Sequence, residues 1–517
     1  MSRYVTEVFM FNSAVCLLDK IASLYPEKTA LIDECSEISF DALRQSALKV
    51  GSALLSNDAT ATAPVIVYMK KSIACIVSFM GILYSGRPYV PVAADMPVSR
   101  VQKIVDNLSP SCIIADADRM ALLKDSDLKN QTILLYDELL TADINSEAIR
   151  ASLSRVIDTD PIYIMYTSGS TGNPKGVTVS HKGVIDYANW TCSEFGFTKD
   201  DVFGNQAPFY FDNSIFDIYS CLLTGATMVI IPEVLFNFQV KLPEYIEEKN
   251  ITVIFWVPTV LINVANGGVL EDHPMPSLKK VLFCGEVMPN TQLNIWRKHH
   301  PDAMYANLYG PTEITDVCTY YVVDRPFDNS DPLPIGKPCR NMRAYIITED
   351  GHLAKTGECG ELCIGGTGVA LGYWNNKEIT DGAFIQNPFN TNYFERIYKT
   401  GDLAYWNEEG LLIFMGRKDS QIKINGNRVE LGEIETAAMC LAGVSGACAV
   451  LDAERNKIVL FLETAETLKL RLVNNELRQY IPKYMLPGEV ITMEKFPHTP
   501  NDKIDRVTLK KTLLERE

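Results

Sequence analysis

The chain has 517 residues, which is too many for one compact domain and enough for two or three. Apolar residues make up 47% and charged residues 22% of the chain, as in an ordinary globular protein. The formal net charge of −16 argues against partners that need a basic surface, namely nucleic acids and anionic membranes.

The N-terminal region carries no clear targeting signal. Glu7 and Asn12 interrupt its apolar residues, so it lacks the continuous apolar region of a signal peptide. The most apolar stretch, residues 74–84, is too short to span a bilayer and is typical of a buried helix. We therefore predict a cytoplasmic protein.

The cysteines are odd in number, 13, and scattered along the chain. Cys359 and Cys363 could form half of a metal site, but no second Cys or His pair is near them in sequence. The alternation of residues 359–363 favours a strand. We expect reduced, mostly buried thiols and no metal bound by cysteine.

From residue 60 onwards, short apolar runs alternate with amphipathic segments of helical length. The runs and segments are 64–69, 72–86, 111–116, 226–231, 242–250, 252–258 and 280–285. This rhythm predicts βαβ units and largely parallel sheets, hence an α/β fold. Residues 161–166 read as a buried strand.

The pattern changes after residues 416–421. Asn425-Gly426 stands between alternating apolar residues, a strong signal for a β-hairpin, and residues 431–443 read as a helix. A second hairpin is predicted around 452–457. We predict a large N-terminal domain, 1–418, and a small α+β C-terminal domain, 419–517, with a hinge at Asp419, which could equally be a surface turn.

The stretch YTSGSTGNPKG, residues 166–176, is rich in glycine and hydroxyl side chains. It is not a nucleotide P-loop, because Pro174 or Val177 stands where the second glycine belongs. The internal proline and lysine also make it a poor flexible linker. We expect a turn between two strands whose N–H groups and hydroxyls bind a polyphosphate, with Lys175 as a point charge.

Seven segments together resemble the motifs of the adenylate-forming superfamily, which includes acyl-CoA synthetases, luciferases and amino-acid adenylation domains of peptide synthetases. They occur in the family's order, at 89–100, 166–176, 307–313, 360–375, 398–403, 416–435 and 501–506. The resemblance covers nearly the whole chain. It implies a carboxylate-activating ligase that uses ATP and Mg²⁺, and it implies that the small C-terminal domain is mobile.

The resemblance also implies which residues bind ATP. The predicted ATP and AMP ligands are Thr167, Ser168, Gly169, Ser170, Thr171, Gly172, Lys175, Tyr309, Gly310, Thr312, Asp402 and Arg417. Tyr309 matches the residue that stacks on adenine, Asp402 the one that binds the ribose, and Glu313 the one associated with Mg²⁺. Lys503 matches the catalytic lysine, although Asp502 stands where the family usually has glycine.

A second half-reaction, transfer of the acyl group to a thiol, is implied by the same resemblance. The small domain would swing about Asp419, and Gly426 would allow close approach of a phosphopantetheine arm. No segment typical of a carrier protein follows Lys503. We therefore expect a carrier protein acting in trans, and the initial Met favours a free-standing enzyme over an excised domain.

Asp212 indicates the kind of carboxylic acid that is activated. It matches the aspartate that pairs with the α-ammonium group in the amino-acid branch, and its surroundings are most similar to those of D-alanine–D-alanyl carrier protein ligases. The implied side-chain pocket is formed by Asn213, Phe216, Phe255, Leu282, Cys284, Leu308, Asp316 and Val317. This pocket would suit a small amino acid. If Asp316 faced it, a substrate hydroxyl or second amine would be favoured; if it faced solvent, alanine or glycine.

Three other functions are less compatible with these residues. An acyl-CoA synthetase acting on a non-amino acid would not need Asp212. A tRNA-charging enzyme would need a basic surface, which the acidic charge opposes. A non-catalytic scaffold would not need Lys175, Glu313, Asp402 and Lys503 together.

Overall fold

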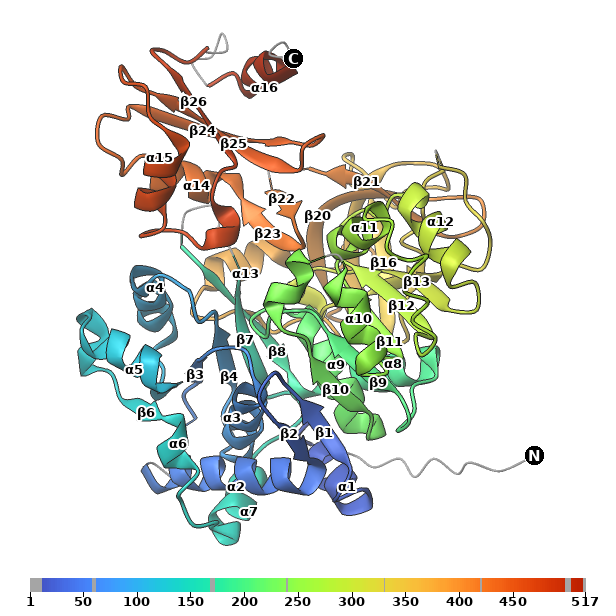
Figure 1. Ribbon diagram of the computed structural model, residues 1–517. Helices are drawn as coiled ribbons and strands as arrows, with labels where there is room; N and C mark the ends of the chain where they lie inside the picture. The colour runs from blue at the N-terminus through green and yellow to red at the C-terminus, as the bar shows by residue number, and fades with distance from the viewer. Residues whose placement is uncertain are drawn as a thin grey trace.

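The computed structural model describes residues 12–57, 62–167, 173–238, 240–329, 331–418, 421–497 and 504–514. Its larger part has two halves. A smaller part, formed by the described residues from 421 onwards, lies above them and is drawn in orange and red (Figure 1). Among the described residues, no helix is both long enough and apolar enough to cross a membrane.

The first sheet of the larger part is parallel in its centre. Its strands, in spatial order, are β15 (Lys337–Pro338), β14 (Thr319–Val322), β13 (Met304–Tyr309), β12 (Lys280–Cys284), β11 (Val253–Trp256), β9 (Val202–Asn205), β10 (Thr227–Ile230), β1 (Thr29–Ile32) and β2 (Glu37–Ser39). Strands β13 to β1 run parallel, whereas β14, β15 and β2 are antiparallel to their neighbours. This confirms the predicted βαβ architecture.

The second sheet is also mostly parallel. It runs β18 (Gly372–Tyr373), β8 (Lys175–Ser180), β7 (Pro161–Thr167), β4 (Tyr89–Val92), β3 (Val65–Tyr68), β5 (Cys112–Ala115) and β6 (Ile133–Leu135). Strands β7 and β8 pair antiparallel, so the predicted turn between two strands is confirmed on both sides of residues 168–172.

A third sheet is antiparallel. It consists of β16 (Met342–Ile347), β17 (Gly360–Gly366), β20 (Arg396–Trp406) and β19 (Phe384–Gln386), with β21 (Leu412–Arg417) paired to β20. Strand β17 confirms the prediction for residues 359–363, and the thirteen cysteines are free, most of them buried.

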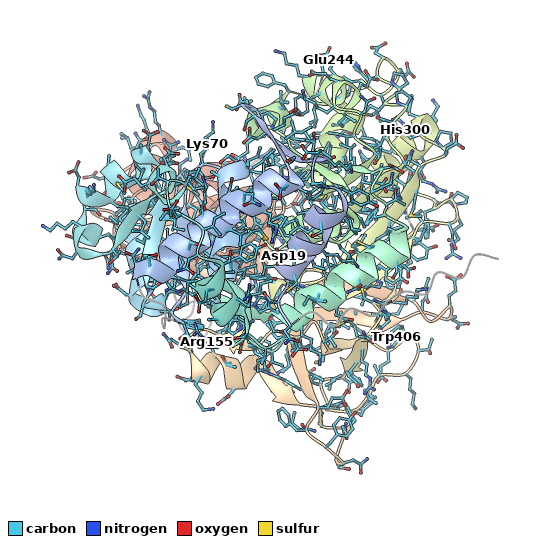
Figure 2. The ribbon with its side chains drawn as sticks, turned by 90° about the horizontal axis from the view of Figure 1, so that it is seen from below. Asp19, Lys70, Arg155, Glu244, His300 and Trp406 are labelled. Atoms are coloured by element: carbon cyan, nitrogen blue, oxygen red, sulfur yellow. The ribbon has the colours of Figure 1, made fainter. Side chains whose placement is uncertain are left out.

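Thirteen α-helices accompany these sheets in the described residues of the larger part. They are α1 (Cys16–Leu24), α2 (Phe40–Asn57), α3 (Ile73–Tyr84), α4 (Val98–Leu108), α5 (Ala117–Lys124), α6 (Tyr136–Leu139), α7 (Ser146–Leu153), α8 (His181–Phe195), α9 (Asn213–Thr224), α10 (Lys241–Glu248), α11 (Pro258–Asn266), α12 (Asn290–His299) and α13 (Lys377–Ala383). Helix α3 is almost wholly buried, as its composition predicts. Figure 2 shows Asp19 near the middle of the face covered by α1 and α2, where its Oδ1 accepts hydrogen bonds from Arg44 and Tyr84.

The smaller part has its own sheets and its own apolar clusters. Its elements are β22 (Gln421–Ile424), β23 (Asn427–Glu430), α14 (Leu431–Ala438), β24 (Gly446–Asp452), β25 (Lys457–Glu463), α15 (Leu470–Leu477), β26 (Glu489–Met493) and α16 (Arg506–Leu514). Both predicted hairpins are present, with Asn425 and Gly426 at positive φ in the first. Asp419 lies outside the described residues, so the domain boundary and the hinge stay predictions.

His181 offers a test of how the N-terminal segment is held. Its buried Nδ1 accepts a hydrogen bond from Ala14 N at 3.1 Å, and burial lowers its pKa to about 4. Because the folded pKa lies below the unfolded value, this stabilisation is complete above about pH 6.5 and is lost as the pH falls toward 4. We expect the wild type to lose about 2–3 kcal/mol more than His181→Asn between pH 7.5 and 4.5 in urea unfolding. Equal losses of unfolding free energy in the two proteins would contradict this stabilising role of neutral, buried His181.

Candidate active site

Glu313 is the most deeply buried carboxylate of the site, on the short helix η3 (Thr312–Ile314). Its Oε1 accepts hydrogen bonds at 2.8 Å from the Tyr373 hydroxyl and from Arg428 Nη1, which also lies 2.8 Å from Oε2. Burial raises the pKa of Glu313, but the Arg428 guanidinium and the Tyr373 hydroxyl outweigh burial and hold it below its usual value. Glu313 is therefore an ionised carboxylate whose cationic partner in this arrangement is Arg428.

Arg428 reaches Glu313 from strand β23 of the smaller part, and the turn before it is held as well. Gly426 N donates to Glu286 Oε1 at 2.8 Å, while Glu286 Oε2 accepts from Thr259 N and Oγ1 at 3.0 and 2.6 Å. Gly426 has φ +77°, and a Cβ there would lie 2.3 Å from Val257 Cγ1. Only glycine fits this turn in this arrangement.

Two further contacts join the parts. The buried side chains of Arg100 and Glu433 form an ion pair, and Ser99 Oγ donates to Gln479 O at 2.5 Å. The smaller part is thus held against the larger one at more than one place.

The residues predicted to bind adenosine come together. Asp402 on β20 accepts a hydrogen bond from the Tyr309 hydroxyl and lies 2.7 Å from Arg417 Nη1. Asp402 and Arg417 are direct neighbours across strands β20 and β21. Burial, followed by the charge of Asp402, raises the pKa of Tyr309 well above its ordinary value, so Tyr309 is the donor.

The predicted phosphate loop is described only at its ends. The Oγ1 atom of Thr167 is buried and has no hydrogen-bond partner among the described residues, a donor that a phosphate oxygen could satisfy. Lys175 Nζ lies 5.8 Å from the centre of the Tyr373 ring, and Tyr373 binds Glu313. The rest of the cradle, Ser168, Gly169, Ser170, Thr171 and Gly172, lies outside the described residues, as does Lys503.

Asp212 stands at the start of helix α9 and is 8% exposed. Its Oδ1 accepts from Asn213 N at 3.2 Å, and it also interacts with Thr312. Burial raises its pKa, which the Thr312 hydrogen bond opposes. In the described part of the chain Asp212 forms no ion pair, so a cation from outside the protein would stabilise it.

The predicted side-chain pocket is assembled from neighbouring strands. Phe255 is paired with Leu282, and Cys284 with Leu308, along β11, β12 and β13, and the rings of Phe216 and Phe255 stack with centres 4.2 Å apart. The apolar members share one core, namely Phe216, Phe255, Leu282, Cys284, Leu308 and Val317. Asn213 begins helix α9 beside them.

Asp316 is 1% exposed, so the solvent-facing alternative is wrong. The Tyr187 hydroxyl donates to its Oδ2. Thr315 and Asp316 both have positive φ, 62° and 71°, which costs about 1–3 kcal/mol per residue. A Cβ on Gly310 would lie 2.1 Å from Asp316 O, so the glycine at 310 makes room for this backbone.

Four residues of the site were missed by the sequence analysis: Tyr373, Arg428, Glu286 and Tyr187. Tyr373 and Arg428 lie inside the segments 360–375 and 416–435, which resemble family motifs, but the sequence analysis predicted no role for them. Glu286 and Tyr187 carry no local signal, since only the tertiary fold brings them to Gly426 and Asp316.

Glu313 suits a metal that is shared with phosphates. Mg²⁺ prefers oxygen ligands and is commonly bound by one or two carboxylates plus substrate phosphates. Within the described ranges, no three His, Cys, Asp or Glu side chains form a group that could hold a metal ion by themselves. The donor chemistry of Glu313 fits, although both of its oxygens contact Arg428 in this arrangement.

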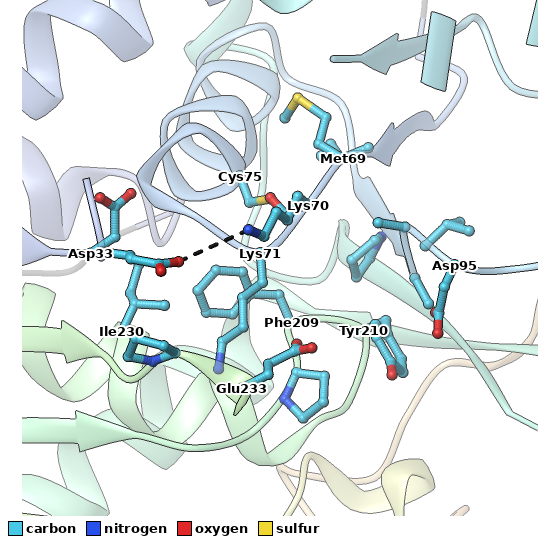
Figure 3. A pocket seen from close by; sticks show the side chains of 18 of the residues that line it. Asp33, Met69, Lys70, Lys71, Cys75, Asp95, Phe209, Tyr210, Ile230 and Glu233 are labelled. Carbon is cyan, nitrogen blue, oxygen red and sulfur yellow. Dashed lines mark hydrogen bonds and ion pairs between the residues drawn. The ribbon is translucent and has the colours of Figure 1, made fainter. Parts of the chain in front are cut away.

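A separate cavity of about 460 Å³ opens where β3, β4 and β10 end. Lys71 lines it, donates from Nζ to Gln206 O at 3.0 Å, and lies 5.4 Å from the centre of the Phe209 ring. Burial lowers its pKa to about 8. Figure 3 shows its amine on the side where Glu233 lies. None of the predicted site residues lines this cavity.

Comparison with known proteins decides the family. Residues 18–374 match the AMP-binding enzyme family. The chain belongs to this family. It is therefore an adenylate-forming ligase that uses ATP, as the motifs predicted.

Relatives of this AMP-binding enzyme include D-alanine–D-alanyl carrier protein ligase of Bacillus cytotoxicus, 33% identical over 505 residues that cover 95% of this chain and 98% of that protein. Tyrocidine synthase 1 of Brevibacillus parabrevis is 32% identical over 95% of this chain, but the chain spans only 44% of its length. The adenylation domain AlmE of Vibrio cholerae, solved with glycyl-adenosine-5'-phosphate, has the same fold, with a TM-score of 0.83, 24% identity and coverage of 99% and 100% of the two chains.

Arg428→Met tests whether the Glu313 ion pair holds the two parts together. Losing the only cation that contacts Glu313 in the described residues leaves a buried charge unpaired, which costs about 3–5 kcal/mol. We expect small-angle X-ray scattering to show a larger radius of gyration, because the smaller part leaves its position more often. The exposed Arg478→Met serves as control. Identical scattering of both variants would contradict this role.

Proposed function

We propose that this AMP-binding enzyme activates a small amino acid as aminoacyl-AMP, releasing pyrophosphate, and then loads it onto the phosphopantetheine thiol of a separate carrier protein. The observation that carries the proposal is Asp212, a buried carboxylate without an ion-pair partner among the described residues. The α-ammonium group of an amino acid would supply that partner. The similarity to carrier protein ligases over nearly their whole length supports the thiol acceptor.

In the first step, a carboxylate oxygen of the amino acid attacks the α-phosphorus of ATP, the new O–P bond forms and pyrophosphate leaves. Tyr309, Asp402 and Arg417 would hold the adenosine, and Lys175 the phosphates. Lys503 would balance charge where the carboxylate and α-phosphate meet. Mg²⁺, held by Glu313 and the phosphates, would neutralise phosphate charge when bound.

Arg428 links this chemistry to the position of the smaller part. Both Glu313 oxygens accept from Arg428 here, so binding of magnesium and phosphates at Glu313 requires Arg428 to withdraw. We infer that adenylate formation uses another placement of the smaller part. In that placement, Lys503 would occupy the position beside the site that residues 423–428 occupy here.

The described placement suits the second step. Pyrophosphate has left with its magnesium after the first step. The thiol then gives up its proton to solvent, its sulfur attacks the carbonyl carbon of the adenylate, and the C–S bond forms while the C–O bond breaks and AMP leaves. Arg428 would then compensate the charge of Glu313, and the turn at Gly426 would leave room for the phosphopantetheine arm.

The alternative is an acyl-CoA synthetase-type ligase acting on a carboxylic acid without an amino group. Such a substrate would leave Asp212 buried and uncompensated, which is unfavourable. ATP–pyrophosphate exchange with L- and D-amino acids separates the two functions: exchange that depends on an amino acid supports the proposal, and exchange only with non-amino acids supports the alternative.

Asp212→Asn tests ammonium recognition. The amide keeps the shape but not the charge, so we expect kcat/KM for amino-acid-dependent exchange to fall about 100-fold or more. Matching urea midpoints would show that the variant folds, and the exposed Asp200→Asn provides a control. Unchanged exchange would mean that the ammonium is bound elsewhere.

Lys503→Ala and Gly426→Leu test the division of labour between the two placements. We expect Lys503→Ala to reduce exchange by about 100-fold or more. Gly426→Leu should spare exchange but block carrier loading, because its side chain would collide with Val257 only in the described placement. Exchange is measured with labelled pyrophosphate and loading by intact-protein mass spectrometry. Loss of exchange in folded Gly426→Leu would refute this division.

A further inference from the structure

Asp316 adds a second buried carboxylate near Asp212. The two side chains are 1% and 8% exposed, and neither forms an ion pair within the described ranges. Burial raises the pKa of Asp316 well above its ordinary value, and the charge of Asp212 raises it further. Two like charges in one apolar region are unfavourable, so Asp316 holds its proton more strongly until a cation compensates its charge.

The charges of this pair act on one buried polar group that has no partner among the described residues. The Tyr163 hydroxyl is completely buried and has no hydrogen-bond partner in the described part of the chain. The charges of Asp212 and Asp316 act on it, and they also act on Cys284 of the predicted pocket. Tyr187 is the only described side chain that donates to Asp316. A buried hydroxyl without a described partner, on which two carboxylates act electrostatically, favours a polar ligand group.

Lys423 on β22 is the cation that acts on both carboxylates. It forms no ion pair with either of them among the described residues. It also belongs to the smaller part, so it leaves if that part moves. Lys423 therefore cannot serve as their permanent partner.

We propose that the substrate is a small diamino acid, whose α-ammonium pairs with Asp212 and whose side-chain ammonium pairs with Asp316. This inference rests on the proposed function and specifies its substrate class. Phe216, Phe255 and Leu282 of the predicted pocket are buried, so we expect a short side chain of one or two methylene groups, as in 2,3-diaminopropionate and 2,4-diaminobutyrate. A hydroxyl could accept or donate a hydrogen bond, but unlike an ammonium group it could not supply Asp316 with a cation.

The test is ATP–pyrophosphate exchange with the whole chain and both enantiomers of 2,3-diaminopropionate, 2,4-diaminobutyrate, ornithine, serine and alanine, together with glycine. We expect one of the two short diamino acids to have a kcat/KM at least 10-fold above serine, alanine and glycine. Highest activity with serine, alanine, glycine or ornithine would overturn the inference while keeping the proposed function. Exchange with no amino acid would overturn both.

Asp316→Asn then tests the residue itself. The ratio of kcat/KM for the diamino acid to that for alanine should fall at least 100-fold, whereas a purely structural role would lower both values equally and leave the ratio unchanged. Tyr187→Phe, which removes the hydroxyl donor, should lower the ratio less, and the exposed Asp324→Asn should not change it. If Asp316→Asn does not fold, Tyr187→Phe and the wild-type substrate panel decide.

Discussion

The buried ion pair between Glu313 and Arg428 is the interaction on which the rest of the arrangement depends. A carboxylate with no solvent exposure needs a cation, and here the cation belongs to a different sheet system from the carboxylate. Any other cation that takes its place, such as a metal with phosphates, must displace Arg428. We infer that occupancy of Glu313 and placement of the smaller part would be coupled by charge, without a separate signalling element.

The same reasoning applies to the substrate side of the site. Asp212 and Asp316 are buried carboxyl groups for which the described residues provide no ion pair, so burial raises the pKa of both, and a cationic ligand would stabilise their charged forms. Under the proposed pairing, such a site would reject uncharged analogues more strongly than an apolar pocket of the same size, because these ligands bring no cation to the two carboxyl groups. Selectivity would then come from the cost of incomplete pairing as much as from favourable packing around the side chain.

Much of the fold could be predicted from the sequence, because its signals are local. The run 280–285 reads as a buried strand, and Asn425-Gly426 predicts the turn that the structure contains. The pairing of Arg428 with Glu313 could not be predicted, since it joins residues far apart in sequence. The inward orientation of Asp316 has no local signal either, because neither Thr315 nor Asp316 is a residue that marks positive φ as glycine does.

The loop 310–316 connects the two halves of the site physically. Gly310 lets the backbone of Asp316 fold back against it, and the left-handed pair at 315 and 316 completes the reversal. Glu313 therefore faces Tyr373 and Arg428, Asp316 faces Tyr187, and Thr312 contacts Asp212. One short, tightly packed segment thus positions the carboxylate predicted for magnesium and phosphates and the carboxylate predicted for the amino acid. A change in its backbone would disturb both sites together, which explains why strain at two consecutive residues is tolerated there.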